Sequence, residues 1–160
     1  MNVYSIYLDS CCYGRPYDNP AHRSQEIVEA QIVAIEGAVE FCKAMGIHIV
    51  GSPTVIGEIK RIKDIEKRQD VLDFYDRAAN VFVDFNDDIY ARAQEIREQA
   101  VVLERIIRNR DSFHVALAEA AGAGFFLTVD DRLERAGAVL ELKTKIINPI
   151  NFLQEFLKWA

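Results

Sequence analysis

Short apolar runs alternate with longer segments of mixed polarity along this chain. The runs that favour strands, by their length and their β-branched and aromatic content, are 2–8, 47–50, 81–85, 125–129 and 145–147. Between them, apolar residues recur at helical spacing over 24–46, 64–78, 89–108 (as one helix or two), 111–121, 131–136 and 150–159. Because strands alternate with helices, we predict a three-layer α/β/α sandwich around a mainly parallel sheet of four to five strands.

Capping and turn residues mark the ends of several predicted elements. Ser24 is typical of a helix N-cap, and Gly46 of a helix end. Pro53 suits the first turn of a further helix, which carries Glu58. The stretch 11–23 contains one glycine and two prolines and is predicted to be a loop.

The composition is that of a globular protein. With 160 residues, half of them hydrophobic and 28% charged, we expect one domain over 1–160. No apolar run approaches the roughly 20 residues of a membrane-spanning helix, and the first residues lack the features of a secretory signal. Cys11, Cys12 and Cys42 form no C-x-x-C pair, so they predict neither disulfides nor a zinc site, and the adjacent pair is expected to be small buried residues. We therefore expect a soluble, cytoplasmic protein.

The net charge of −6, from 25 acidic and 19 basic side chains, excludes a general electrostatic attraction to nucleic acid. A local basic rim remains compatible with this balance. The candidates for weak substrate contacts follow the first predicted strand or Glu58, and each also has the ordinary explanation of a solvated surface charge: Arg15, Arg23, Lys60, Arg61 and Lys63.

Acidic residues stand where apolar runs end or a helix begins. Asp9 ends the first run, Glu58 follows the second, Asp111 opens an alanine-rich helix, and Asp130 follows the run at 125–129. In a parallel sheet the carboxyl ends of strands meet at one edge, so these side chains are predicted to converge. Converging carboxylates repel one another unless a cation lies between them. The sequence therefore predicts a divalent-metal site.

Each aspartate at a helix start also has a purely structural explanation. A carboxylate there accepts backbone N–H groups and favours the helix dipole, which is sufficient to account for Asp111 or Asp130 taken alone. Asp9 is harder to explain in this way, because the predicted loop separates it from the first predicted helix. The occurrence of all four acids at matching positions favours the metal site.

The chain resembles PIN-domain proteins, the nuclease fold shared by VapC-type toxins. The resemblance covers nearly the whole length. It is carried by YLDS at 7–10, the isolated Glu58, the segment 110–133, and INP at 147–149. The most specific part is the aspartate that opens an alanine-rich helix, followed by a glycine-containing turn and a buried strand ending in T-x-D.

The resemblance implies roles at individual positions. Asp9, Glu58, Asp111 and Asp130 match the family's metal-binding and catalytic acids. Ser10 and Thr128 match positions whose hydroxyls orient the site, and Asp131 is an alternative to Asp130 because the two are adjacent.

Carboxylate oxygens suit hard cations, so the expected cofactor is Mg²⁺ or Mn²⁺. Such an ion makes a bound water more acidic and stabilises charge on phosphate oxygens. His114 lies three residues after Asp111, on the same helix face, where it could touch the site or a phosphate, but a partly buried packing histidine is the favoured interpretation. His22 and His48 have no partner at metal-ligand spacing.

The leading hypothesis is a metal-dependent endoribonuclease that hydrolyses RNA phosphodiester bonds, the toxin of a type II toxin–antitoxin pair, inhibited by an antitoxin protein. The resemblance also implies a homodimer, for which the segment 24–44 offers apolar surface. The alternative is a catalytically silent PIN-like module that binds RNA or protein. A third class is a DNA nuclease or phosphohydrolase, because a fold does not determine its substrate.

Overall fold

The computed structural model describes residues 3–19 and 24–157, with the side chain of residue 157 excepted. Its centre is a five-stranded parallel sheet in the order β3-β2-β1-β4-β5. The strands are β1 (Ser5–Leu8), β2 (His48–Gly51), β3 (Val81–Phe82), β4 (Phe125–Leu127) and β5 (Lys145–Ile147). This is the predicted α/β class, and every predicted strand is present: β1, β3 and β4 are shorter than predicted, β2 is shifted by one residue, and β5 has the predicted bounds.

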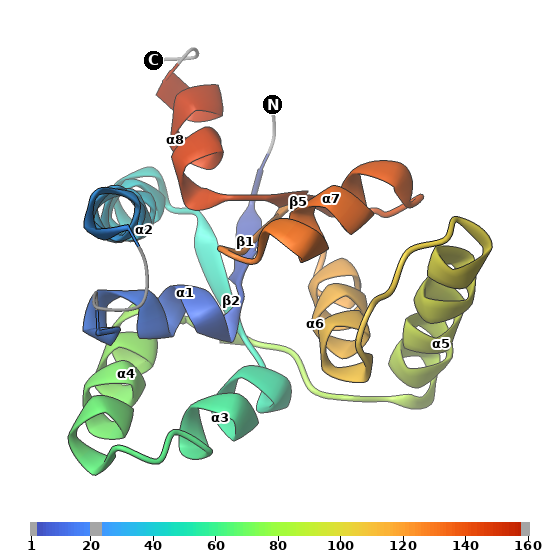
Figure 1. Ribbon diagram of the computed structural model, residues 1–160, viewed down its shortest axis with the longest axis horizontal. Helices are drawn as coiled ribbons and strands as arrows, with labels where there is room; N and C mark the ends of the chain where they lie inside the picture. The colour runs from blue at the N-terminus through green and yellow to red at the C-terminus, as the bar shows by residue number, and fades with distance from the viewer. Residues whose placement is uncertain (1–2, 20–23, 158–160) are drawn as a thin grey trace.

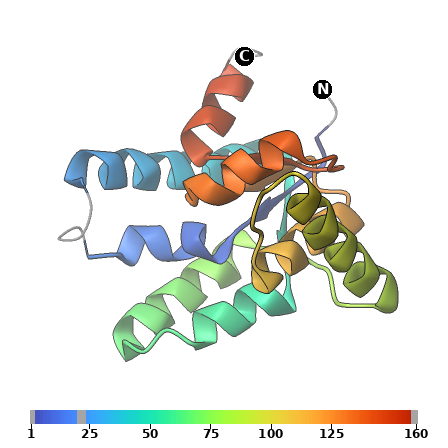
Figure 2. The same ribbon diagram turned by 45° about the vertical axis from the view of Figure 1, so that its right-hand side comes forward.

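Helices cover both faces of the sheet. They are α1 (Ser10–Gly14), α2 (Gln25–Met45), α3 (Pro53–Lys60), α4 (Ile65–Ala78), α5 (Asp87–Val102), α6 (Asn109–Ala120), α7 (Asp131–Val139) and α8 (Pro149–Leu157), with a 3₁₀ turn, η1, at Arg15–Tyr17. Figure 1 shows α1, α2, α4 and α8 on one side of the strands and α5, α6 and α7 on the other. Figure 2 shows α5 standing outside α6, so that α6 lies nearer the sheet. The predicted three-layer sandwich is confirmed.

The core forms where the helices bury both faces of the central strands. Ile6, Tyr7 and Leu8 of β1 are all completely buried, as expected of a strand with a neighbour on each side and helices above and below. The ring of Tyr7 stacks on that of Phe126 in the adjacent β4, with centroids 5.2 Å apart. Among the described residues, no helix is long and apolar enough to cross a membrane.

The prediction of a loop over 11–23 is wrong for the first part of this stretch. Residues 10–14 form α1 and 15–17 form η1, whereas 20–23 lie outside the described residues. Cys12 and Tyr13 are completely buried, and Tyr13 packs edge-on against Phe74 and Tyr75 of α4. Gly14 is the last residue of α1 and Pro16 lies within η1, so neither residue prevents a short helix here.

The helix predicted to reach residue 108 stops earlier, at Val102. Glu104 takes the left-handed conformation, with φ 57°, and Arg105 N–H turns back to donate to Ala100 O at 2.8 Å. Val102 and Ile106 are 81% and 91% exposed, so these two side chains make little apolar contact that would favour continuing the helix. At the other end of the chain, α8 begins at Pro149 itself, and the end predicted near 159 lies outside the described residues.

Gly51, at the end of β2, is required by the close approach of α4. A Cβ at this position would lie 2.0 Å from Tyr75 Oη. We predict that Gly51→Ala lowers the free energy of unfolding by about 1–3 kcal/mol through overpacking, and that adding Tyr75→Phe restores part of the loss. Urea unfolding of both variants and of Tyr75→Phe alone measures this, and an unchanged midpoint for Gly51→Ala would contradict it.

Candidate metal centre

The pairing of β1 with β4 places Asp9 at the centre of one sheet edge. Leu8 pairs with Leu127, so Asp9 and Thr128, the next residues along each strand, lie side by side. Thr128 Oγ1 donates to Asp9 Oδ2 at 2.9 Å, and Asp9 N–H donates to Leu127 O at 2.9 Å. Asp9 is only 5% exposed. Its carboxylate is thus fixed by the strand before it and by the hydroxyl predicted to orient the site.

Glu58 comes from α3, which begins beside the end of β2. Ser52 caps this helix by accepting the N–H of Val55, and Pro53 occupies its first position, as predicted. From there the helix carries Glu58 back to the end of β1. Ser10 Oγ donates to Glu58 Oε2 at 2.5 Å and lies 3.4 Å from Asp9 Oδ1. Ser10, predicted as a supporting residue, therefore lies between the two carboxylates.

His114 belongs to this cluster, which corrects the expectation that it only packs. It is completely buried, but its Nε2 lies 2.5 Å from Glu58 Oε1 and 3.6 Å from Asp9 Oδ1. One ligand atom from each of Asp9, Glu58 and His114 lies within 4.8 Å of the others. The signal was present in the sequence, because the i, i+3 spacing from Asp111 places His114 on the same helix face.

A buried chain of hydrogen bonds holds His114 from behind. Its Nδ1 lies 2.7 Å from Tyr7 Oη, which lies 2.6 Å from Ser52 Oγ. Both hydrogen bonds are buried. Breaking either one would leave a desolvated polar group without a partner, which is unfavourable. Glu58 is thereby connected through His114 and Tyr7 to the N-cap of its own helix. Neither Tyr7 nor Ser52 was predicted to support the site.

The charges within the cluster favour a Glu58 carboxylate facing a protonated His114. Burial alone would raise the pKa of Glu58, but hydrogen bonds from His114 and Ser10 and the charges of His114 and Arg110 outweigh it and lower the pKa. Burial would lower the pKa of His114, but its hydrogen bond to Glu58 and the charges of Asp9, Glu58 and Asp111 raise it. A protonated ring can donate to Glu58 and to Tyr7 at once.

Asp111 and Asp130 form an outer pair joined by a cation of the chain itself. Arg108 Nε donates to Asp111 Oδ2, and its second terminal nitrogen donates to Asp130 Oδ2, each at 3.2 Å. Burial, and then the charge of Asp9, raises the pKa of Asp111 against the opposing effects of Arg108 and His114. Among the described residues, the group that could hold one ion consists of Asp9, Glu58 and His114, and the predicted Asp111 and Asp130 lie outside this group.

Asp130 also has the capping role that was its structural alternative. Its Oδ1 accepts from Arg132 N at 3.0 Å and from Leu133 N at 3.4 Å. Asp111 is different, because α6 has Arg108 at its N-cap and Asp111 within its first turn. Asp131 is exposed in the first turn of α7, and the structure gives it no contact with the other acids. Between the two adjacent aspartates, the geometry favours Asp130.

The predicted basic contacts are not brought together. Arg15 is 4% exposed, and its guanidinium pairs with Asp18 at 3.0 Å. It therefore stabilises the turn after α1 and does not form an exposed rim, which corrects that prediction. Lys60 is exposed at the end of α3. Arg61, the C-cap residue of α3, lines a hollow that also includes Glu58, whereas Arg23 lies outside the described residues.

The adjacent cysteines differ in their surroundings. Cys12 is completely buried, as expected, and its Sγ donates to Leu127 O at 3.3 Å. Cys11 is only partly buried, and its Sγ donates to Asp9 Oδ2 at 3.3 Å. The hydrogen bond with Cys12, then burial and the charge of Asp9, raises the pKa of the Cys11 thiol. Cys11 is therefore a neutral donor to the carboxylate and not a thiolate ligand.

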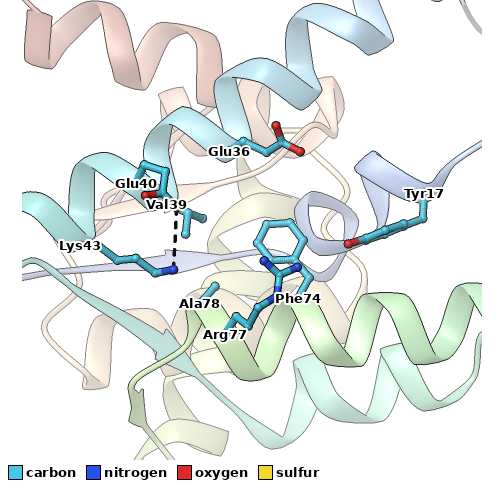
Figure 3. Close-up of a pocket in the computed structure, with 8 residues that line it drawn as sticks. All are labelled: Tyr17, Glu36, Val39, Glu40, Lys43, Phe74, Arg77 and Ala78. Atoms are coloured by element: carbon cyan, nitrogen blue, oxygen red, sulfur yellow. Dashed lines mark ion pairs between the residues drawn. The ribbon is translucent and has the colours of Figure 1, made fainter.

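An arginine-rich hollow opens beside the outer acids. It has a volume of about 540 Å³ and lies between the segment 104–108 and α7. Besides Asp111 and Asp130, its walls include four arginines that the sequence analysis missed: Arg105, Arg108, Arg132 and Arg135. A separate hollow between α2, η1 and α4 contains Glu36, Lys43 and Arg77 (Figure 3), and it shares no residue with the acidic cluster.

The residues present fit a hard divalent cation. Within the described part of the chain, neither Asp9 nor Glu58 is paired with a lysine or arginine, and His114 is the basic group that both approach. Carboxylate oxygens from two elements converge there, and such oxygens suit Mg²⁺ and Mn²⁺. Asp9 and Glu58 would hold such an ion, with Asp111 and Asp130 on its outer side.

The sequence profile of the PIN domain matches residues 19–139. Similar solved structures include VapBC2 from Rickettsia felis bound to a DNA fragment from their promoter, which is 19% identical with a TM-score of 0.62 over 90% of this chain and 98% of that chain. FitAcB from Neisseria gonorrhoeae is 17% identical with a TM-score of 0.58 over 90% and 97%. VapBC-5 from Mycobacterium tuberculosis, a member of the VapBC family of toxin-antitoxin systems, is 13% identical with a TM-score of 0.57 over 91% and 98%. No curated protein matches the chain.

The Glu58–His114 pair predicts a pH-dependent stability of the metal-free protein. The raised pKa of His114 gives stability that is present below its ordinary value of 6.5 and is lost as pH rises through the folded pKa. The lowered pKa of Glu58 gives stability that is present above 4.5 and is lost as pH falls through the folded pKa. Unfolding in urea with EDTA should show that His114→Gln costs more stability at about pH 6 than at about pH 9. A cost independent of pH would show that the pair is uncharged.

Proposed function

The chain belongs to the PIN domain family, and on that premise we propose that it is a metal-dependent endoribonuclease, the toxin of a type II toxin–antitoxin pair. One observation carries the proposal. The buried carboxylate of Asp9 faces Glu58 and His114 without a lysine or arginine partner in the described part of the chain. A buried charge of this kind is costly unless a cation neutralises it.

Each residue of the cluster has a task in this proposal. Asp9 and Glu58 bind the cation through oxygens already oriented by Thr128 and Ser10. His114 restrains the remaining oxygen of Glu58. When bound, Mg²⁺ or Mn²⁺ would lower the pKa of a water molecule, so that its deprotonated form is available as a nucleophile, and would stabilise charge on the phosphate oxygens.

The arginine-rich hollow supplies the substrate contact that the net charge does not. Arg105, Arg132 and Arg135 lie beside the outer acids, where guanidinium groups can bind successive phosphates of one strand. The arginines of this hollow place positive charge next to the metal site. A nucleic acid can therefore bind there although the net charge of the chain is −6. This arrangement supports a phosphodiester substrate over a small phosphate ester.

A protein partner fits the same proposal. The structures to which the chain is similar include toxin-antitoxin complexes, and we extend that partnership to this chain as an inhibitor that covers the acidic site. A homodimer and a single domain over 1–160 are part of the proposal. Arg108 already bridges two of the acids, so a cation from a partner would meet a site that accepts guanidinium groups.

Cleavage of RNA tests the proposal directly. Purified protein with Mn²⁺ or Mg²⁺ should cut a single-stranded RNA, and excess EDTA should abolish the cut. Asp9→Asn should lose more than about 100-fold in rate, above the usual cost of removing an outer-shell partner of a metal site. Full activity in EDTA, or in Asp9→Asn, would remove the proposal. Parallel single-stranded DNA and duplex substrates distinguish a ribonuclease from a DNA-directed enzyme.

Metal affinity tests the role of Arg108. Its guanidinium neutralises Asp111 and Asp130 and should therefore compete with a cation. Because Arg108 is largely exposed, we predict a modest gain for Arg108→Gln, up to about 5-fold in Mn²⁺ affinity. Isothermal titration calorimetry measures it, with Arg77→Gln as a control that removes the same charge away from the site. Equal affinities in the two variants would contradict competition, and no stoichiometric binding in any form would favour a catalytically silent module.

A further inference from the structure

An aromatic hollow of about 270 Å³ adjoins the acidic cluster on the side of α3. Its walls include Glu58, Arg61, Phe85, Tyr90, Arg110 and Phe113. Its aromatic rings and Arg61 have no part in the metal chemistry proposed above. We propose that this aromatic hollow binds an unpaired nucleobase of the substrate strand, next to the phosphate that is cut. The inference rests on the proposed nuclease function and specifies which form of nucleic acid the site accepts.

The rings of Phe85, Tyr90 and Phe113 pack against one another to form a platform, and that of Tyr90 is accessible to solvent. Phe85 and Tyr90 stack with centroids 4.9 Å apart and planes 16° apart, and each meets Phe113 nearly at a right angle. Phe113 is held in turn by Arg97, whose guanidinium lies 5.5 Å from the ring centroid and donates to Ser112 Oγ. Tyr90 nevertheless remains 49% exposed. A base can therefore stack on a surface that is already ordered.

Helix α6 places this platform in register with the acids. Asp111 and His114 are three residues apart and face the acidic cluster, whereas Arg110 and Phe113, with the same spacing, line the aromatic hollow. Glu58 belongs to both sites. A strand whose phosphate lies at the acidic cluster therefore has its neighbouring base next to the rings.

Charge and size favour a nucleotide over a purely apolar occupant. Arg61 and Arg110 are exposed, and within the described residues neither forms an ion pair. They can neutralise the phosphates on either side of a stacked base. The volume of about 270 Å³ lies just below the usual range for drug-sized ligands, roughly 300–1,000 Å³, which suits one ring system. In a duplex the base would have to leave its partner first, so the aromatic hollow selects unpaired strands.

The test combines a change in the protein with a change in the substrate. After the wild-type cleavage site in a single-stranded RNA is mapped, each neighbouring nucleotide is replaced by an abasic one. At one position the abasic substrate should be cut about 5- to 150-fold more slowly by the wild type, the range of one base–aromatic stack. Tyr90→Ala should lose the same factor on intact RNA and nothing further on the abasic substrate, whereas Tyr90→Phe should retain activity.

Matched variants separate stacking from folding. Tyr4 directly precedes β1, at the end of the strand away from Asp9, and is 71% exposed. Tyr4→Ala should therefore remove a similar ring without an effect on cleavage. Gly57 lines the aromatic hollow, and a Cβ there would meet no atom within 4 Å. Gly57→Leu should therefore fill the space, retain the thermal stability of the helix and slow cleavage of single-stranded RNA. The same change at Gly14, also open, is its control.

The outcomes distinguish this inference from the proposed function. If the wild type cuts RNA but Tyr90→Ala and the abasic substitutions act independently, the inference is overturned and the nuclease stands. If the wild type cuts nothing, the nuclease fails. The platform is then judged by fluorescence of a single-stranded oligonucleotide that contains 2-aminopurine. Quenching in the wild type that is lost in Tyr90→Ala supports base stacking, and equal signals overturn it. RNA and DNA strands are compared in each arm.

Discussion

The burial of the Asp9 carboxylate at the centre of a parallel sheet edge is the constraint on which the rest of this structure depends. Asp9 follows a buried strand, so the chain cannot move it into water without disturbing the core. Neutral donors from Thr128 and Cys11 surround its Oδ2. These donors satisfy hydrogen bonds but do not cancel a charge. Even with His114 protonated, the two carboxylates of Asp9 and Glu58 leave a net negative charge, which a bound cation would neutralise.

The same constraint explains why distant parts of the chain are organised around one point. The α3 helix is capped by Ser52, and Ser52 is linked through Tyr7 to His114, which restrains Glu58. Core packing and carboxylate geometry are therefore coupled, because Tyr7 also stacks on Phe126 of the next strand. On the outer side Arg108 does for Asp111 and Asp130 what a metal would do for the inner pair. The site therefore has two parts. The buried part, with Asp9 and Glu58, can take an ion, whereas the more exposed part, with Asp111 and Asp130, already has the positive charge of Arg108.

The strands and the position of Asp9 at the edge of the sheet could be predicted from the sequence. The apolar runs locate the strands, and the parallel order brings their carboxyl ends together, so the contact of Asp9 with Thr128 follows from topology. The contacts of His114 were less accessible, since a buried histidine in a helix has the same pattern whether it touches Glu58 or only apolar neighbours. Arg15 was misjudged because its burial depends on Asp18 and on the α1 helix, which local composition does not predict. The end of α5 depends on the left-handed Glu104 and on exposed valines, and neither is a strong signal.

The central claim is that Asp9 and Glu58 share one divalent ion. Crystals grown with Mn²⁺ and measured at the manganese absorption edge test it most directly, because anomalous scattering locates the ion independently of any assay of activity. The account predicts an anomalous peak at coordination distance, about 2.0–2.2 Å for such ions, from oxygens of both carboxylates. A peak held only by Asp111 and Asp130, or no peak at this edge of the sheet, would contradict it.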